Sequence, residues 1–353
     1  SSGQSAFFSS RRRHTRLREV TGVQTCALPI GPQYLVAAPS KAPNRHAYTD
    51  SSSSATSMTT GIKTYNGAIT VDANGKQVNT IAHLAQREGY KIGVVSSVPI
   101  SHATPASAYA HNVHRNDYQD ITRDMLGLPS IRHPDEPLAG LDVVIGGGHG
   151  HMLAKSSGQG DNYVPGNNYL TDEDLAKIDV KNGGDYVVAQ RTSDTAGAEM
   201  LNAAATLAAT EGKRLLGFFG VGTAKGHLPY QTANGDFATV PGKTKKAEPY
   251  TPADIAENPT LANMTSAAIT ALEPSDKGFW LLVEPGDVDW ANHDNNLDNS
   301  IGAVNSGDAA VKVISDWVEK NSDWNESLMI VTADHGHYLV LDRPEMLISP
   351  KTK

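Results

Sequence analysis

Short apolar runs that alternate with helical patterns constrain the fold of this chain more than any other feature. Six runs predict buried strands: Lys91–Ser97, Leu141–Ile145, Tyr186–Ala189, Leu215–Phe219, Gly278–Val283 and Leu328–Val331. Four stretches with helical spacing adjoin them: Val78–Tyr90, Asp194–Thr210, Pro259–Leu272 and Ser300–Lys320. Such an alternation is typical of a largely parallel sheet with helices on both faces. We therefore predict an α/β protein with three layers, α/β/α.

Charge and hydropathy exclude two classes of partner. The chain has 353 residues and a formal net charge of −8, which argues against nucleic acid as a specific partner. No apolar run approaches the roughly 20 residues of a membrane span. The expected partner is therefore a small molecule. If that molecule is anionic, bound metal ions would supply the local positive charge that an acidic protein lacks.

The first thirty residues differ from the rest of the chain. Five arginines fall within eight residues, 11–18, without apolar periodicity, and Val20–Ile30 resembles a translated sequencing adapter. We expect residues 1–30 to be an artefact and disordered, and residues 31–353 to form one catalytic domain. A basic arm or transit peptide is the rival interpretation. Two stretches of the domain, 156–168 and 232–258, are predicted to be loop decorations.

Carboxylates and imidazoles lie just past the ends of two predicted strands. Glu284 follows one strand and is itself followed by Asp289 and His293, while Asp334-His335-Gly336-His337 follows another. Active sites in such folds lie beyond the carboxyl ends of the strands. Both residue types bind Zn²⁺. The pattern predicts metal-assisted chemistry.

A serine-rich segment from Asp50 to Gly67 offers a nucleophile. It reads as a two-turn helix with Ser51 at its N-terminus, where unpaired N–H groups and a partial positive charge would favour an alkoxide and an incoming phosphate. The alternative is a serine-rich linker. Spacing alone leaves both interpretations open.

The chain resembles the alkaline phosphatase family from about Tyr48 to about Leu341. The resemblance is carried by Thr49–Ser51, Lys63–Gly67, Val331–His335 and the spacing of the acids and histidine from Glu284 to His293. It implies hydrolysis of phosphate monoesters through a phosphoserine, with two zinc ions and one magnesium ion. It also implies small-molecule phosphate monoesters as substrates, export to the periplasm or beyond, and a homodimer.

The resemblance assigns the zinc ligands residue by residue. Ser51 matches the nucleophile and, once deprotonated, a ligand of the second zinc. Asp334 and His335 match the other ligands of that ion. Asp289 and His293 match ligands of the first zinc, and their four-residue spacing places both on one face of a helical turn.

Further matches concern magnesium and the phosphate. Thr104 and Glu284 match hard oxygen ligands of Mg²⁺, and Arg115 matches the arginine that clamps two phosphate oxygens. Four more residues match groups that contact the metal and phosphate ligands rather than the ions themselves: His337, His102, Trp290 and Asp50. Packing in the core is the rival interpretation for Trp290.

The sequence also departs from the family pattern. The family has an aspartate that bridges zinc and magnesium before the nucleophile, and a distal zinc-binding histidine. Neither has a match here, so we expect a fragment cut short at both ends, with weak metal binding and weak activity. A phosphodiesterase or sulfatase of the same superfamily remains an alternative, as does a non-catalytic metal- or phosphate-binding module. A sulfatase would need proline and arginine at fixed spacing after its nucleophile, and Ser51 is followed by Ser52–Ala55.

The remaining candidate functional residues have weaker support from the sequence. The triplet Gly146–Gly148 is predicted to be a structural turn rather than a phosphate loop, although His149 and His151 follow it. The remaining histidines are scattered and are predicted to be surface or core residues: His46, His83, His111, His114, His133 and His227.

Overall fold

A seven-stranded sheet forms the centre of the molecule. The computed structural model describes residues 4–10, 49–155, 158–243 and 246–337. The strand order is β6-β7-β3-β2-β8-β1-β9, and the pairs from β6 to β8 are parallel. The sheet strands are β1 (Gln4–Ser10), β2 (Lys91–Pro99), β3 (Val143–Gly147), β6 (Tyr186–Gln190), β7 (Arg214–Phe218), β8 (Phe279–Glu284) and β9 (Leu328–Ala333). A separate hairpin-like pair joins β4 (Met152–Leu153) and β5 (Gly166–Asn167).

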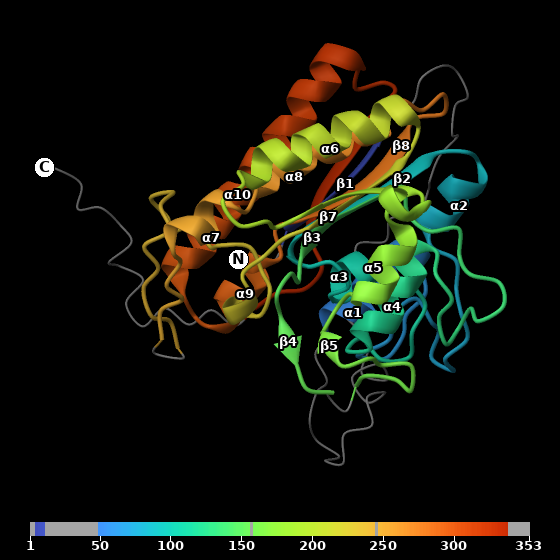
Figure 1. Cartoon of the computed structure of the whole chain (residues 1–353), viewed down its shortest axis with the longest axis horizontal. Helices are drawn as coiled ribbons and strands as arrows, with labels where there is room; N and C mark the ends of the chain where they lie inside the picture. Colours follow the sequence, from blue (N-terminus) through green and yellow to red (C-terminus); the bar gives the residue numbers. More distant parts are fainter. Residues whose placement is uncertain (1–3, 11–48, 156–157, 244–245, 338–353) are drawn as a thin grey trace, which may run out of the picture.

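Helices cover both faces of the sheet, as the alternation of elements predicted (Figure 1). The helices are α1 (Ser51–Thr60), α2 (Ile81–Arg87), α3 (Ala103–Ala106), α4 (Tyr118–Leu126), α5 (Asp172–Ile178), α6 (Gly197–Glu211), α7 (Pro252–Ala256), α8 (Leu261–Leu272), α9 (Asp287–His293) and α10 (Leu297–Asn321). Helices α6, α8 and α10 pack on one face, and α2, α4 and α5 on the other. None of the helices in the described ranges is both long and apolar enough to cross a membrane.

Successive side chains along the central strands point to opposite faces of the sheet and pack into two separate hydrophobic cores. In β8, Leu281 and Val283 join the core beneath α6, α8 and α10, whereas Trp280 and Leu282 join the opposite core. Every residue of β8 is buried. A strand that is buried on both faces has a continuous apolar sequence. For this reason the range predicted from the sequence, 278–283, nearly coincides with β8.

The structure describes a strand within the N-terminal segment that we expected to be disordered. Residues 4–10 form β1, which pairs antiparallel with β8 on one side and with β9 on the other. Strands β8 and β9 do not pair with each other, so the backbone N–H and C=O groups on their facing edges need other hydrogen-bond partners. The backbone of β1 supplies those hydrogen bonds. The rest of the supposed artefact, residues 1–3 and 11–30, lies outside the described residues.

The glycine triplet acts as a close-packing device, as predicted. Gly146 and Gly147 end β3, and a Cβ added to Gly147 would lie 2.3 Å from the carbonyl oxygen of Gly226. Gly148 has φ +117° and donates its N–H to the same carbonyl. Only residues without a side chain allow the two loops to approach this closely.

The two predicted decorations are only partly irregular. Within 156–168 the structure places β5, and within 232–258 it places α7. Helix α7 begins with a capping box at Thr251 and a proline at its first turn, which are standard helix-start signals. Residues 156–157 and 244–245 lie outside the described residues.

Candidate metal-assisted active site

Ser51 is the first residue of α1, so the serine-rich segment is a helix rather than a linker. The side chain of Asp50 caps this helix by accepting a hydrogen bond from the N–H of Ser53 at 2.9 Å. Ser51 is almost fully buried. It therefore lies at the positive end of the helix dipole, where an alkoxide or a phosphate is stabilised.

The hydroxyl of Ser51 meets a histidine from the far end of the chain. Ser51 Oγ lies 3.0 Å from Nε2 of His335, and Ser54 Oγ donates to Oδ2 of Asp334 at 3.4 Å. The other ring nitrogen of His335 lies 3.2 Å from the carbonyl oxygen of Gly336 and must donate to it. A neutral His335 ring that donates from Nδ1 has its lone pair on Nε2, which faces the hydroxyl of Ser51; the same hydroxyl also contacts the carboxylate of Asp334.

Glu284 and α9 bring the second group of ligands to the same edge of the sheet. Glu284 ends β8, and after a sharp turn α9 presents Asp289 and His293 one helical turn apart. A Cβ on Gly286 would lie 2.6 Å from a methyl group of Val98, so the turn can pass close to β2 only with glycine at that position.

Three imidazoles converge on one carboxylate oxygen. Asp289 Oδ1 lies 2.8 Å from Nε2 of His337, 3.4 Å from Nε2 of His293 and 3.5 Å from Nε2 of His335. None of these contacts has hydrogen-bond geometry, so this buried oxygen has no hydrogen-bond partner within the described ranges. A buried oxygen of this kind normally has a partner, and a cation among these nitrogens and oxygens would provide one.

Electrostatics at this cluster favour a charged Asp289. Burial alone would raise the pKa of Asp289, but its contacts with His293 and His337 hold that pKa well below its usual range. The same carboxylate raises the pKa of the His293 imidazole. Burial raises the pKa of Asp334, which lies beside this group. Acids and imidazoles of this kind, packed together, form a donor set suited to Zn²⁺.

A separate set of oxygen donors surrounds Glu284. Its carboxylate accepts a 2.5 Å hydrogen bond from Ser96 Oγ and another from the hydroxyl of Thr104, which is buried on α3. Burial raises the pKa of Glu284 to about 7, against the opposite effect of these hydrogen bonds. An all-oxygen donor set of this kind suits a hard cation such as Mg²⁺.

Arg115 is anchored beside the nucleophile. Its Nη1 donates to Oδ2 of Asp50, the residue directly before Ser51, at 3.0 Å. His102 lies nearby with its ring edge-on to Trp290 at 5.4 Å. Burial lowers the pKa of His102 to about 3, so this imidazole is neutral at physiological pH.

The side chain of Trp290 lies between two histidines. Its ring is edge-on to His227 at 5.3 Å as well as to His102. Trp290 is only partly buried, and the structure leaves packing as an interpretation of it.

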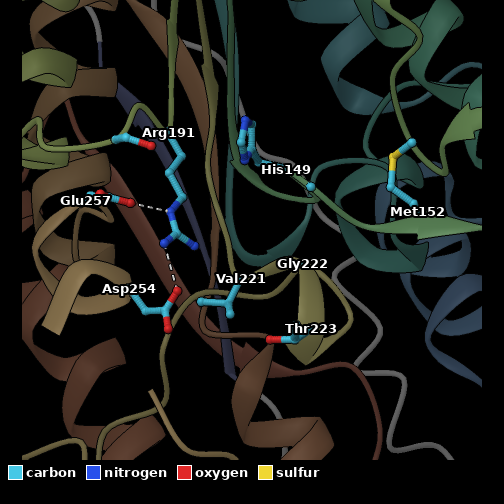
Figure 2. Close-up of a pocket in the computed structure, with 10 residues that line it drawn as sticks. His149, Met152, Arg191, Val221, Gly222, Thr223, Asp254 and Glu257 are labelled. Atoms are coloured by element: carbon cyan, nitrogen blue, oxygen red, sulfur yellow. Dashed lines mark hydrogen bonds and ion pairs between the residues drawn. The ribbon is translucent and has the colours of Figure 1, made fainter. Parts of the chain in front are cut away.

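A hollow of about 480 Å³ lies apart from this cluster, beyond β6 and β7 (Figure 2). Arg191 crosses it, with Nη2 2.7 Å from Asp254 and Nε 2.9 Å from Glu257. Its charge is therefore already balanced by two carboxylates. His149 lines the same hollow and does not join the residues around Ser51.

A sequence model of the alkaline phosphatase family matches residues 25–346. The chain belongs to the alkaline phosphatase family. Alkaline phosphatase 4 of Bacillus subtilis is 29% identical over 290 residues, which are 81% of this chain and 49% of the relative. The alkaline phosphatase of Escherichia coli K12 is 32% identical over 335 residues, 93% of this chain and 65% of the relative.

Solved structures of alkaline phosphatases share the fold. The cold-active enzyme of Shewanella sp. superposes with a TM-score of 0.54 at 25% identity, over 78% of this chain and 52% of that one. This chain thus spans about half to two thirds of the length of the relatives described here. The match shows that this chain has the same α/β fold as solved alkaline phosphatases.

Sequence reasoning missed several polar groups that support the site. Ser96 bonds to Glu284, Ser97 Oγ donates to Asp287 at 2.5 Å, and Ser54 bonds to Asp334. Ser96 and Ser97 are polar residues at the carboxyl end of an otherwise apolar buried strand. That break in the apolar pattern was the signal that could have revealed them.

Proposed function

We propose that this chain hydrolyses phosphate monoesters through a phosphoserine at Ser51. The proposal rests chiefly on one observation: the hydroxyl of a buried serine at a helix N-terminus lies within hydrogen-bond distance of His335, within a cluster of acids and imidazoles. This arrangement activates one hydroxyl and concentrates the donors that divalent cations prefer.

We propose two zinc ions and one magnesium ion as the cofactors. Asp289 and His293 would hold the first zinc, with His337 close behind them or on the ion itself. The second zinc would be held by residues 334, 335 and 51. Glu284 and Thr104 would hold magnesium. Bound ions would lower the pKa of the nucleophile and neutralise the charge of the attacking and leaving oxygens.

The chain's own residues would carry the phosphoryl group through two displacements. Ser51 Oγ loses its proton and forms a bond to phosphorus while the bond from phosphorus to the ester oxygen breaks, and the departing alcohol gains a proton. Arg115, held in place by Asp50, binds two phosphate oxygens with its planar fork. Water then attacks phosphorus, so that the serine oxygen regains a proton and inorganic phosphate departs.

Substitution of Ser51 tests the reaction. The chain, loaded with Zn²⁺ and Mg²⁺, should hydrolyse an aryl phosphate slowly, because two metal ligands of the family have no match here, and should yield an acid-stable phosphoserine at position 51. Ser51→Ala should lower kcat by at least about 10³-fold, in line with loss of a covalent nucleophile. Equal turnover by both proteins, or no turnover and no labelling in either, would contradict the proposal.

The same assay separates the alternatives. Faster turnover of a phosphodiester or of a sulfate ester than of the monoester would favour another branch of the superfamily. Zinc binding without hydrolysis of any of the three would indicate a binding module. Because the proposed site binds only the phosphate group of the substrate, we expect it to accept phosphate monoesters of many different alcohols.

Export and pairing are proposed from family membership. We propose that the protein acts in the periplasm or outside the cell and forms a homodimer. Fractionation of cells and sedimentation of the purified protein test the two statements separately. Recovery in the cytoplasmic fraction would contradict the first, and a monomer at micromolar concentration the second.

A further inference from the structure

A second cluster of potential metal ligands lies away from Ser51, where α4 meets the loop of residues 127–142. His111 precedes α4, Asp124 lies near the C-terminal end of α4, and His133 lies on the loop. One ligand atom from each of these residues falls within 4.8 Å of the other two. Asp124 and His111 are buried, and the side chain of His133 is 13% exposed.

The spacing of these atoms fits tetrahedral coordination. His111 Nδ1 lies 3.1 Å from His133 Nε2, and the latter lies 3.9 Å from Asp124 Oδ2. Ligands about 2.0–2.1 Å from a tetrahedral zinc are separated from each other by about 3.3 Å. Small side-chain shifts would therefore bring all three atoms onto one ion.

Hydrogen bonds around the pair orient the two ring nitrogens toward each other. His111 Nε2 lies 3.1 Å from the carbonyl oxygen of Val78 and must donate to it, which leaves Nδ1 without a proton. Gln77 Nε2 lies 3.4 Å from the carbonyl oxygen of Arg132, so it is the amide nitrogen. It also lies 3.3 Å from His133 Nε2, and the two facing ring nitrogens lie within hydrogen-bond distance of each other. A bound cation would take the place of the proton that this pair shares.

The third residue has an unused acceptor. Asp124 Oδ2 accepts the N–H of His111 at 2.8 Å, but Oδ1 is buried without a hydrogen-bond partner among the described residues. An unsatisfied buried carboxylate oxygen costs free energy comparable with a lost charged hydrogen bond. A cation would satisfy it.

Charges on the surrounding elements are nearly balanced. Arg132 lies on the same loop and acts on all three groups, whereas Asp120, one turn earlier on α4, acts on Asp124 and His133 with the opposite sign. Asp120 is held by the side chains of Asn112 and Asn162. The two carboxylates outweigh the one arginine, so a divalent cation meets a net negative charge.

We propose that His111, Asp124 and His133 bind a divalent transition-metal ion, most suitably Zn²⁺, with water as the fourth ligand. Two neutral imidazoles and one carboxylate are donors that suit zinc. The ion would tie the 127–142 loop to α4 and brace the segment that leads from His111 to Arg115. Its role is structural, and it is separate from the residues around Ser51.

The number of zinc ions bound per chain tests the proposal directly. The purified chain is loaded with Zn²⁺, dialysed, and assayed for bound zinc by atomic emission. Asp124→Asn and His133→Ala should each bind one zinc ion fewer than the unsubstituted chain. Asparagine keeps the shape of the side chain and an acceptor for the N–H of His111, so circular dichroism should report a folded protein. His149→Ala, which removes a histidine elsewhere, should bind the full number.

A second measurement isolates this site from the one around Ser51. In a chain carrying Asp289→Asn and His335→Ala, Co²⁺ should still give the visible absorption of a tetrahedral site, and Asp124→Asn added to that chain should abolish it. Equal zinc content in all variants, or no tetrahedral absorption in the Asp289/His335 background, would overturn the proposal. The cluster would then be a hydrogen-bonded pair with its proton between the imidazoles.

Discussion

Several buried histidines in this protein are held without a proton. Burial lowers the pKa of His83 to about 3 and that of His111 to about 4. The His83 ring stacks on Tyr109 at 4.5 Å and on His111 at 5.1 Å. An imidazolium in this place would lose its hydration without gaining a carboxylate partner, so acid should act on the folded state through these rings.

Replacement of His83 by glutamine should make stability less sensitive to acid. The pKa of His83 in the folded state lies below its unfolded value of 6.5, so its contribution to stability is complete above about pH 6.5 and is lost as pH falls toward 3. At pH 5 the loss from this one group is about 2 kcal/mol. Glutamine keeps the capping-box acceptor at this helical position.

Urea unfolding in the presence of a chelator, at pH 7 and pH 5, measures this effect. The difference in unfolding free energy between the two pH values should be smaller for His83→Gln than for the unsubstituted chain. An identical difference for both proteins would show that His83 does not titrate in this range. Lys181→Gln, a change of charge at an exposed site, serves as the control.

At the scale of elements, Asp50 joins the start of α1 to Arg115, the arginine that we propose binds phosphate. One carboxylate oxygen caps the helix at Ser53, and the other contacts Arg115 and the N–H of Gly67. Burial alone would raise the pKa of Asp50, but hydrogen bonds from Ser52 and Ser53 and the charge of Arg115 hold that pKa below its usual value. One residue therefore positions both the nucleophile and its partner.

Two substitutions of Asp50 should separate these roles. Asp50→Asn keeps a good helix cap, whereas Asp50→Ala removes it and should cost about 1 kcal/mol more in unfolding free energy. Both remove the charge that holds Arg115, so both should weaken inhibition by inorganic phosphate to a similar degree. Equal stability of the two variants, or loss of phosphate inhibition in the alanine variant alone, would contradict this division of roles.

Elements with strong local signals were predicted closely. Helix α10 was predicted as 300–320 and runs from Leu297 to Asn321, because its apolar stripe is long and regular. Helix α2 begins only at Ile81, since Thr80 and His83 form a capping box that the predicted start at Val78 overlooked. Short helices such as α3, with four residues, carry too little periodicity to be recognised.

At the scale of the molecule, the site draws its residues from separate elements that only the fold brings together. Ser51 belongs to α1, Glu284 to β8, Asp289 to α9, and Asp334 and His335 follow β9. Ions bound by these residues would cross-link α1 with the segment that follows β9, in which His335 lies 284 residues after Ser51. Metal binding should therefore stabilise the domain as well as activate the serine.

Metal removal should lower the thermal stability of the whole chain. At a free zinc concentration 100 times the dissociation constant, one site adds about 2.7 kcal/mol to the unfolding free energy. Differential scanning calorimetry with and without a chelator measures the shift in Tm, and added Zn²⁺ should reverse it. The shift should shrink in Asp289→Asn and persist in His149→Ala. A shift of the same size in both variants would mean that the stabilising ion binds elsewhere.

The sequence by itself determined the layered α/β class and the strands that are buried on both faces, because these features depend on residue type and on spacing over a few positions. The resemblance to the alkaline phosphatase family, rather than spacing, indicated which residues would meet around Ser51. Only the tertiary structure decided that β1 pairs between β8 and β9, that Asp289 faces three imidazoles, and that His111, Asp124 and His133 form one cluster. Such contacts depend on strand order, burial and the path of loops, so no local pattern in the chain specifies them.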